Sequence, residues 1–272
     1  EWADSGEIWD AFGESYRLLG AYENAIESYQ KAVKRSDAKI RTIEQLASTQ
    51  SRIGGQLIQK SLRLGNTDFT RAKDVLGTAI KRLELLVVID PSSERHSLLG
   101  ATYKRYALTL SPSNQQESDQ QESDQQESES RETWFNKAKA EYEKAIKLDP
   151  SDLYYPLGNK IGLVLLVAAA DADLLTMLES DLEAMANNLE PKTDSWARFS
   201  KIDVKLYRFL ASEGIGHAVE GCDAGAIAQK YDTALNTNAS ASINERDSVL
   251  SQIRLFADYA KSAKIREAAQ QV

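Results

Sequence analysis

The stretch WDAFGESYRLLGAYENAIESYQKAVKRSD, residues 9–37, decides the fold. Trp9, Phe12 and Tyr16 are spaced three and four residues apart and therefore share one face of a helix. Gly13 has no side chain, so a neighbouring helix can approach closely at its position. A Leu-Gly-Ala-Tyr sequence then reverses the chain before a second helical segment. The stretch predicts two antiparallel helices that pack as a hairpin, with all of these positions in the packing.

The second helix of this hairpin repeats the alternation of small and large residues. Ala25 and Ala32 allow close packing, and Tyr29 fills the space between them. Together with Trp9 and Gly13, this pattern closely resembles a tetratricopeptide repeat. The resemblance implies an all-α fold, an α-solenoid in which helical hairpins stack on one another.

Part of a second copy surrounds an acidic tract. Tyr16 precedes Ala25 by 9 positions, whereas Tyr103 precedes the matching Ala138 by 35, an excess of 26. We interpret residues 111–132, with their tandem Gln-Gln-Glu-Ser-Asp sequence, as an insertion in the turn of a hairpin, which loop-closure entropy tolerates. The pentapeptide has no apolar residue to bury, so we expect disorder. The default interpretation is a repeat expansion without a function. The alternative is an acidic segment that attracts a basic partner.

Fainter copies and further helical segments fill the rest of the chain. The copies carry Ala79, Leu83 and Pro91 as a second helix, Tyr154, Leu157, Gly158 and Ile161 as a first helix, and Ile227, Tyr231 and Ala234 as a second helix. Helical segments without the full signature are expected at 38–64, 172–189, 193–212 and 243–268, the last as a terminal capping helix. We predict ten to twelve helices in a single solenoid over residues 1–272.

Composition favours a helical, cytoplasmic protein. The chain is 42% hydrophobic and 27% charged, and its single Cys222 excludes an internal disulfide, which favours a reducing compartment. The apolar run at 161–170 is shorter than the roughly 20 residues that span a bilayer, so we expect a buried helix and no membrane partner. Because the sequence begins at Glu1 and shows no leader, we expect a fragment of a longer, multidomain chain.

The net charge of −8 is concentrated in the acidic tract. Residues 111–132 hold seven acidic residues and one basic residue, which leaves 34 acidic and 32 basic residues elsewhere. Nucleic-acid binding requires clustered Lys and Arg to replace phosphate counterions. The sequence therefore favours a protein or peptide partner and not nucleic acid.

The order of the segments is similar to the tetratricopeptide-like sensor region of bacterial conflict-system proteins and of apoptosis-signal-regulating kinases. The stretches that carry this resemblance are ERHSLLGATYKRYA at 94–107, YEKAIKLDPSDLYYPLGNKIGLVLL at 142–166, QKYDTAL at 229–235 and ERDSVLSQIRLFADYA at 245–260. The resemblance implies a signalling role in which the helical region senses a partner and controls an effector domain on the same chain. The acidic insertion departs from the family pattern.

Stacked hairpins present a groove lined by the first helix of each repeat, so binding is the favoured function. In the first repeat, Glu7, Asp10, Glu14 and Arg17 are expected to project from the non-packing face. These residues do not match the Lys and Asn pattern of repeats that clamp a C-terminal carboxylate.

The middle of the chain offers a more basic candidate surface. The candidate partner-binding residues are Arg95, Lys104, Arg105, Tyr155, Asn159 and Lys160. They belong to two predicted first helices and together could hold an acidic peptide or a small anionic ligand. The alternative is that these residues serve solubility and local hydrogen bonding.

We expect no catalytic residues, no metal site and no cofactor. The enzymatic alternative is a cysteine hydrolase that pairs Cys222 with His217, or less directly with His96. The glycines around this pair lack the Gly-Lys-Ser/Thr ending of a phosphate-binding loop. A third alternative is a spacer or dimerisation module with a symmetric contact through the terminal helix.

Overall fold

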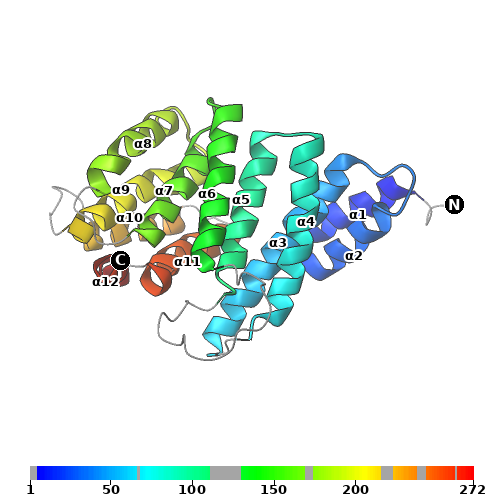
Figure 1. Cartoon of the computed structure of the whole chain (residues 1–272), viewed down its shortest axis with the longest axis horizontal. Coiled ribbons are helices and arrows are strands. Elements are labelled where there is room, and N and C mark those ends of the chain that lie inside the picture. The colour runs from blue at the N-terminus through cyan, green and yellow to red at the C-terminus, as the bar shows by residue number, and fades with distance from the viewer. Residues whose placement is uncertain are drawn as a thin grey trace, which may run out of the picture. The chain divides into compact units, whose positions relative to one another are not determined.

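The computed structural model describes residues 5–65, 68–110, 130–168, 174–215, 223–237, 243–260 and 262–272. Within these residues it contains twelve helices and no strand, which confirms the all-α fold of stacked hairpins (Figure 1). The chain divides into two compact units, Glu1–Ala145 and Ile146–Val272. The single solenoid expected over residues 1–272 stays a prediction.

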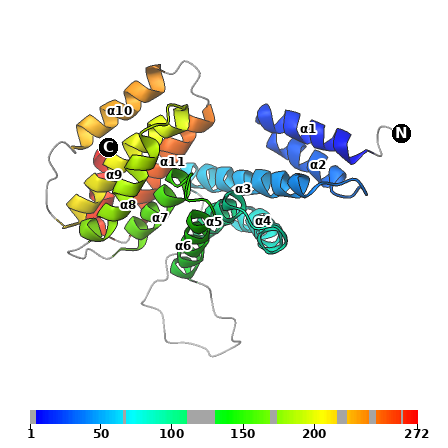
Figure 2. The same cartoon turned by 90° about the horizontal axis from the view of Figure 1, so that it is seen from above.

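The first unit contains three hairpins. Their helices are α1 (Gly6–Leu18), α2 (Tyr22–Ala32), α3 (Ile40–Arg63), α4 (Thr70–Ile89), α5 (Ser93–Ala107) and α6 (Arg131–Leu148), the last of which ends just beyond the unit boundary. In each hairpin the odd-numbered helix is the first helix and the even-numbered one is the second. Successive helices from α1 to α5 pack on one another in chain order (Figure 2).

The hairpin of α1 and α2 has the predicted packing at its centre. Tyr29 and Ala25 are fully buried, and a Cβ added to Gly13 would lie 2.5 Å from the Tyr29 ring. Gly20 adopts a positive φ of 75° in the turn, a conformation that is strained for other residues. Ser5 caps the start of α1, because its hydroxyl accepts a hydrogen bond from the Ile8 amide.

One aromatic residue of this hairpin does not lie where the sequence predicts. Phe12 is 48% exposed, so its expected place in the packing is wrong. Its ring contacts the Trp9 ring at a centroid distance of 5.8 Å. The three- and four-residue spacing places Phe12 beside the packing face, and only the neighbouring helices decide whether such a position is covered.

In the second hairpin, a glycine of α3 packs against a leucine of α4. A Cβ added to Gly54 of α3 would lie 2.4 Å from the Leu76 side chain of α4. Ala79 and Leu83 are fully buried in α4, which confirms the second helix predicted from these residues.

The third hairpin confirms that the two separated halves of the second copy pack together. A Cβ added to Gly100 would lie 3.1 Å from both the Ala138 carbonyl oxygen and the Tyr142 ring. The Trp134 ring of α6 contacts the Tyr103 ring of α5 at a centroid distance of 5.3 Å. The acidic tract lies between these helices in the sequence, and the predictions for residues 111–129 lie outside the described residues.

The second unit contains the remaining helices. They are α7 (Tyr154–Val167), α8 (Leu174–Leu189), α9 (Ser195–Ile215), α10 (Ala224–Thr237), α11 (Ile243–Tyr259) and α12 (Ala263–Gln271). Leu157 and Ile161 of α7 are buried, and so are Ile227 and Tyr231 of α10, as predicted. The Gln252 side-chain amide on α11 donates a 2.7 Å hydrogen bond to the Tyr207 hydroxyl on α9.

The prediction of one helix over 243–268 is wrong. The chain breaks after Tyr259, and α12 starts at Ala263 with the extended Ser262 as its N-cap residue. Ile265, Ala268 and Ala269 of α12 are buried. The break lets α12 bury a face of its own, and the serine before a new apolar period was its signal in the sequence.

No helix in the described part of the chain is both long and apolar enough to cross a membrane.

Candidate functional site

The predicted site residue Arg95 lies at the start of α5 and is held inside the first unit. Its Nε donates a 2.7 Å hydrogen bond to Glu44 on α3, and its side chain is 13% exposed while that of Glu44 is 11% exposed. Arg95 also forms an ion pair with Asp90, whose hydrogen bond raises the pKa of the guanidinium. This arginine therefore ties two successive first helices together.

The other two predicted residues of α5 lie in its last turn. Arg105 donates a 2.9 Å hydrogen bond to the Ser51 hydroxyl on α3 and lies over Gly55, where an added Cβ would be 3.2 Å from its Nε. Lys104 is partly buried. Arg105, like Arg95, therefore reaches across to α3.

The remaining predicted residues belong to α7 in the second unit. Lys160 forms a 2.7 Å ion pair with Asp181 of α8, and the Asn159 amide donates a 2.9 Å hydrogen bond to the Tyr155 carbonyl oxygen. Tyr155 is 47% exposed. The six predicted residues thus form two sets, one in each unit, and Arg95 and Lys160 are each already engaged in an ion pair.

The residues of the enzymatic alternative are placed only in part. Cys222 and His217 lie outside the described residues. His96 is buried in the third hairpin, where its Nδ1 lies 2.6 Å from Glu141 Oε2. Glu141 also pairs with Lys144, so His96 belongs to an internal polar cluster between α5 and α6.

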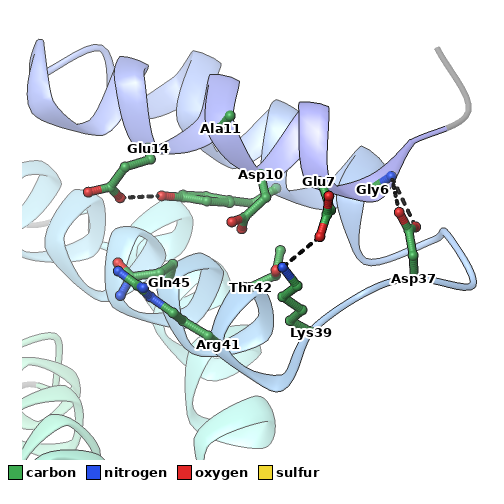
Figure 3. Close-up of a pocket in the computed structure, with 11 residues that line it drawn as sticks. Gly6, Glu7, Asp10, Ala11, Glu14, Asp37, Lys39, Arg41, Thr42 and Gln45 are labelled. Atoms are coloured by element: carbon green, nitrogen blue, oxygen red, sulfur yellow. Dashed lines mark hydrogen bonds and ion pairs between the residues drawn. The ribbon is translucent and has the colours of Figure 1, made fainter. Parts of the chain in front are cut away.

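A cavity of about 390 Å³ lies in the first unit, between α1 and the start of α3. Its lining residues are Gly6, Glu7, Asp10, Ala11, Glu14, Tyr29, Asp37, Lys39, Arg41, Thr42 and Gln45 (Figure 3). Glu7, Asp10 and Glu14, three of the residues predicted to project from α1, follow one face of this helix and line the cavity. The cavity lies between two successive first helices, which is where the predicted groove should be.

The outer end of the cavity is closed by the connection between α2 and α3. Both carboxylate oxygens of Asp37 accept hydrogen bonds of 3.0 Å from the Gly6 amide. Lys39 forms a 2.8 Å ion pair with Glu7 in which both side chains are more than 60% exposed. An ion pair this exposed contributes little stability and opens readily.

The inner end of the cavity is formed by hydrogen-bonded side chains. Glu14 accepts hydrogen bonds from Arg17, at 2.6 and 2.8 Å, and from the Tyr29 hydroxyl, at 3.0 Å. The hydrogen bond from Arg17 lowers the pKa of Glu14, while burial raises the pKa of Tyr29. Glu14 is therefore ionised and Tyr29 is neutral at physiological pH.

Asp10 lies between these two ends, and its carboxylate points from α1 toward α3 (Figure 3). Its Oδ1 atom is shielded from solvent and accepts no hydrogen bond within the described part of the chain. On the opposite wall the exposed Arg41 interacts electrostatically with Glu14, but its side chain donates no hydrogen bond to a described residue. Asp10 and Arg41 thus keep hydrogen-bonding capacity that the fold does not use.

Sequence reasoning named the residues on the α1 side of this cavity as outward-facing but placed the candidate site elsewhere, and it missed the other wall. The missed residues are Asp37, Lys39, Arg41, Thr42 and Gln45. The helix expected at 38–64 carries no full repeat signature, so its outward face was not assigned. The order of the helices was a signal for that face. A helix that follows a complete hairpin is the first helix of the next hairpin, and first helices line the groove.

The described residues contain no group of three or more His, Cys, Asp or Glu side chains that could hold a metal ion. The carboxylates of the cavity are therefore spread along its walls and do not converge on one point.

Comparison with protein families gives a match that covers more than half of the chain. The profile of the Tetratricopeptide Repeats-Sensor family matches residues 11–166, from the second turn of α1 to the end of α7. The chain matches none of the curated proteins with which it was compared. The matched region contains α2 to α6 and most of α1, and the contacts of Gly13 with Tyr29 and of Gly100 with Tyr142 carry the repeat pattern in it. This chain therefore belongs to the Tetratricopeptide Repeats-Sensor family.

Proposed function

We propose that this chain is a non-catalytic sensor module that binds a peptide or protein partner at the cavity between α1 and α3. The observation that carries the proposal is the position of the cavity between two successive first helices, the face that helical-repeat proteins use for binding. Its walls hold side chains whose polar groups are not needed to maintain the fold, with Asp10 on one side and Arg41 on the other. A ligand at these two residues would not have to break a hydrogen bond between either one and a described residue.

The hydrogen bonds that hold the α1 wall of the cavity support the same proposal. Tyr29 is fully buried and fixes Glu14, while Asp37 fixes the first residue of α1. A preformed surface binds with a smaller loss of conformational entropy than one that must order on binding. The sensor therefore meets its partner with its α1 wall already in place.

Recognition is proposed to regulate an effector domain on the same polypeptide. Repeat units contact mainly their neighbours, so a partner that binds better to one arrangement of the hairpins at α1 and α3 shifts the protein toward that arrangement. The basic set of α5 (Arg95, Lys104 and Arg105) and the α7 set stay proposed as further contact residues for an acidic peptide or small anionic ligand. Their engagement requires the Glu44 and Asp181 ion pairs to open.

Site-specific photocrosslinking in the full-length protein tests this proposal. The photoreactive residue benzoylphenylalanine is placed at Arg41, an exposed residue of the cavity, or at Lys81, an exposed residue of α4 away from it. We expect a partner that crosslinks from position 41 and not from position 81. Equal crosslinking from both positions, or crosslinking from position 81 alone, would reject the cavity as the binding site.

The proposed regulation of the effector domain is tested by a separate measurement. The activity of the effector is measured in the full-length protein with and without the crosslinked partner. We expect a change in that activity when the partner binds. If the effector activity is unchanged at a saturating concentration of the partner, the chain binds its partner but does not regulate an effector.

A further inference from the structure

The cavity between α1 and α3 differs in charge from the basic surface expected from the sequence. Four carboxylates line it, from Glu7, Asp10, Glu14 and Asp37, against the two cations Lys39 and Arg41. A cleft lined mainly by charges of one sign raises the local concentration of groups of the opposite sign. The net charge of the lining side chains is therefore negative.

Three of the four carboxylates already have partners inside the protein. Glu7 pairs with Lys39, Glu14 with Arg17 and Tyr29, and Asp37 with the Gly6 amide. Asp10 differs, because its solvent-shielded Oδ1 has no hydrogen-bond partner among the described residues. A shielded carboxylate oxygen without a donor is costly, and native proteins usually satisfy such atoms with water, an ion or a ligand.

We propose that the cavity between α1 and α3 binds a basic side chain of the partner, lysine or arginine, whose charged group donates hydrogen bonds to Asp10. This inference rests on the proposed function and names the chemical group that the sensor recognises. The volume of about 390 Å³ is at the small end of ligand pockets, which suits a single long side chain. A metal ion is disfavoured because the carboxylates do not converge.

The wall opposite Asp10 makes the cavity selective. Arg41 repels the incoming cation. Only a positive group that reaches the Asp10 carboxylate gains an attraction larger than this repulsion. The side-chain amide of Gln45 lies on the same wall and can accept a hydrogen bond from a second donor of the ligand (Figure 3). An arginine, with five donors in a fixed fork, can engage both walls at once.

Amide NMR titration of the 272-residue chain tests the inference. The probe is the peptide acetyl-Gly-Ser-Arg-Ser-Gly-amide, and its matched control carries citrulline, which has the same shape without the charge. We expect saturable shifts in α1 and at the start of α3 for the arginine peptide. Affinity should fall roughly tenfold or more for the citrulline peptide, because a charge-assisted hydrogen bond is lost.

Two substitutions with opposite expected effects separate charge recognition from damage to the fold. Asp10→Asn keeps the shape of the side chain and should weaken binding of the arginine peptide roughly tenfold. Arg41→Ala removes the repelling cation and should strengthen binding by about two- to fivefold. Damage to the fold would weaken binding in both variants, and thermal melting of each variant checks that both are folded.

The outcomes that overturn the inference are distinct. They are citrulline and arginine peptides of equal affinity, unchanged affinity in Asp10→Asn, weaker binding in Arg41→Ala, or no shift with about 10 mM arginine peptide. Crosslinking of the partner from position 41 alongside any of these results leaves the binding site in place and removes only its preference for a basic side chain. Absence of crosslinking from position 41 removes both proposals.

Discussion

The Tyr29 hydroxyl donates a 3.0 Å hydrogen bond to Glu14 Oε2, which joins the core of the first hairpin to the wall of the cavity. The Tyr29 ring is fully buried against Gly13, so its hydroxyl has little freedom to move. A residue of the repeat pattern that packs two helices therefore also orients a carboxylate of the candidate binding site.

Substitution Tyr29→Phe keeps the ring and removes this hydrogen bond. Because the acceptor is a carboxylate, we expect the free energy of unfolding to fall by about 1.5–3 kcal/mol. Urea denaturation measures the change. Tyr16→Phe on α1 is the matched control, since the Tyr16 hydroxyl forms no hydrogen bond to a described residue, and an equal loss in both variants would contradict the role of the Tyr29–Glu14 bond.

Substitution Gly13→Ala tests the close approach of α1 and α2. The added Cβ would lie 2.5 Å from the rigid Tyr29 ring, so we expect a loss of about 1–3 kcal/mol in the free energy of unfolding. Gly77→Ala on α4 is the control, because nothing lies within 4 Å of its added Cβ. There alanine should stabilise the helix by about 0.5–1 kcal/mol. Thermal or urea unfolding of both variants gives the comparison, and a stabilised Gly13→Ala variant would contradict the packing.

Substitution Arg95→Ala distinguishes a structural role of this predicted site residue from a binding role. It leaves Glu44, which is 11% exposed, without its ion-pair partner, so we expect a loss of about 1–3 kcal/mol in the free energy of unfolding. The double substitution Arg95→Ala/Glu44→Gln should recover part of that loss, because the unpaired charge is gone. Losses that simply add in the double variant would show that the two side chains are not coupled.

The fold was predictable where the sequence repeats the spacing of residues whose size decides the packing. Gly13 with Tyr29, and Gly100 with Tyr142, form the same close contact in two hairpins, although the acidic tract separates the second pair. The break between α11 and α12 was missed although Ser262 marks it in the sequence, and the exposure of Phe12 was missed because it depends on which neighbouring helix covers that face. Spacing within one helix does not contain that information.

The candidate site was predictable on one wall only. Glu7, Asp10 and Glu14 follow from the outward face of a well-marked first helix. Arg41 comes from a helix whose repeat signature is weak, and its position opposite Asp10 depends on the angle between α1 and α3. The positive charge of Arg95 makes it a candidate, yet the sequence does not show that Glu44, 51 positions earlier, pairs with it.

Acid should weaken the first hairpin through Glu14. The hydrogen bond from Arg17 places its folded-state pKa below its ordinary value of 4.5, so its stabilising contribution is complete above pH 4.5 and is lost as the pH falls through the folded pKa. Urea denaturation between pH 7 and pH 3 should show a smaller acid-induced loss in Glu14→Gln than in the unchanged chain. Glu23→Gln, on the exposed side of α2, should leave the loss unchanged, and identical pH profiles for all three proteins would contradict the assignment.

The most direct test of the account is the affinity of the crosslinked partner for a chain whose cavity is filled. Gln45→Trp places a large side chain in the wall of the cavity, and Asn136→Trp places the same side chain on the exposed surface of α6. With both variants folded by circular dichroism, isothermal titration calorimetry should show at least about a tenfold loss of affinity for Gln45→Trp and no change for Asn136→Trp. Unchanged affinity in Gln45→Trp would contradict the claim that the partner binds between α1 and α3.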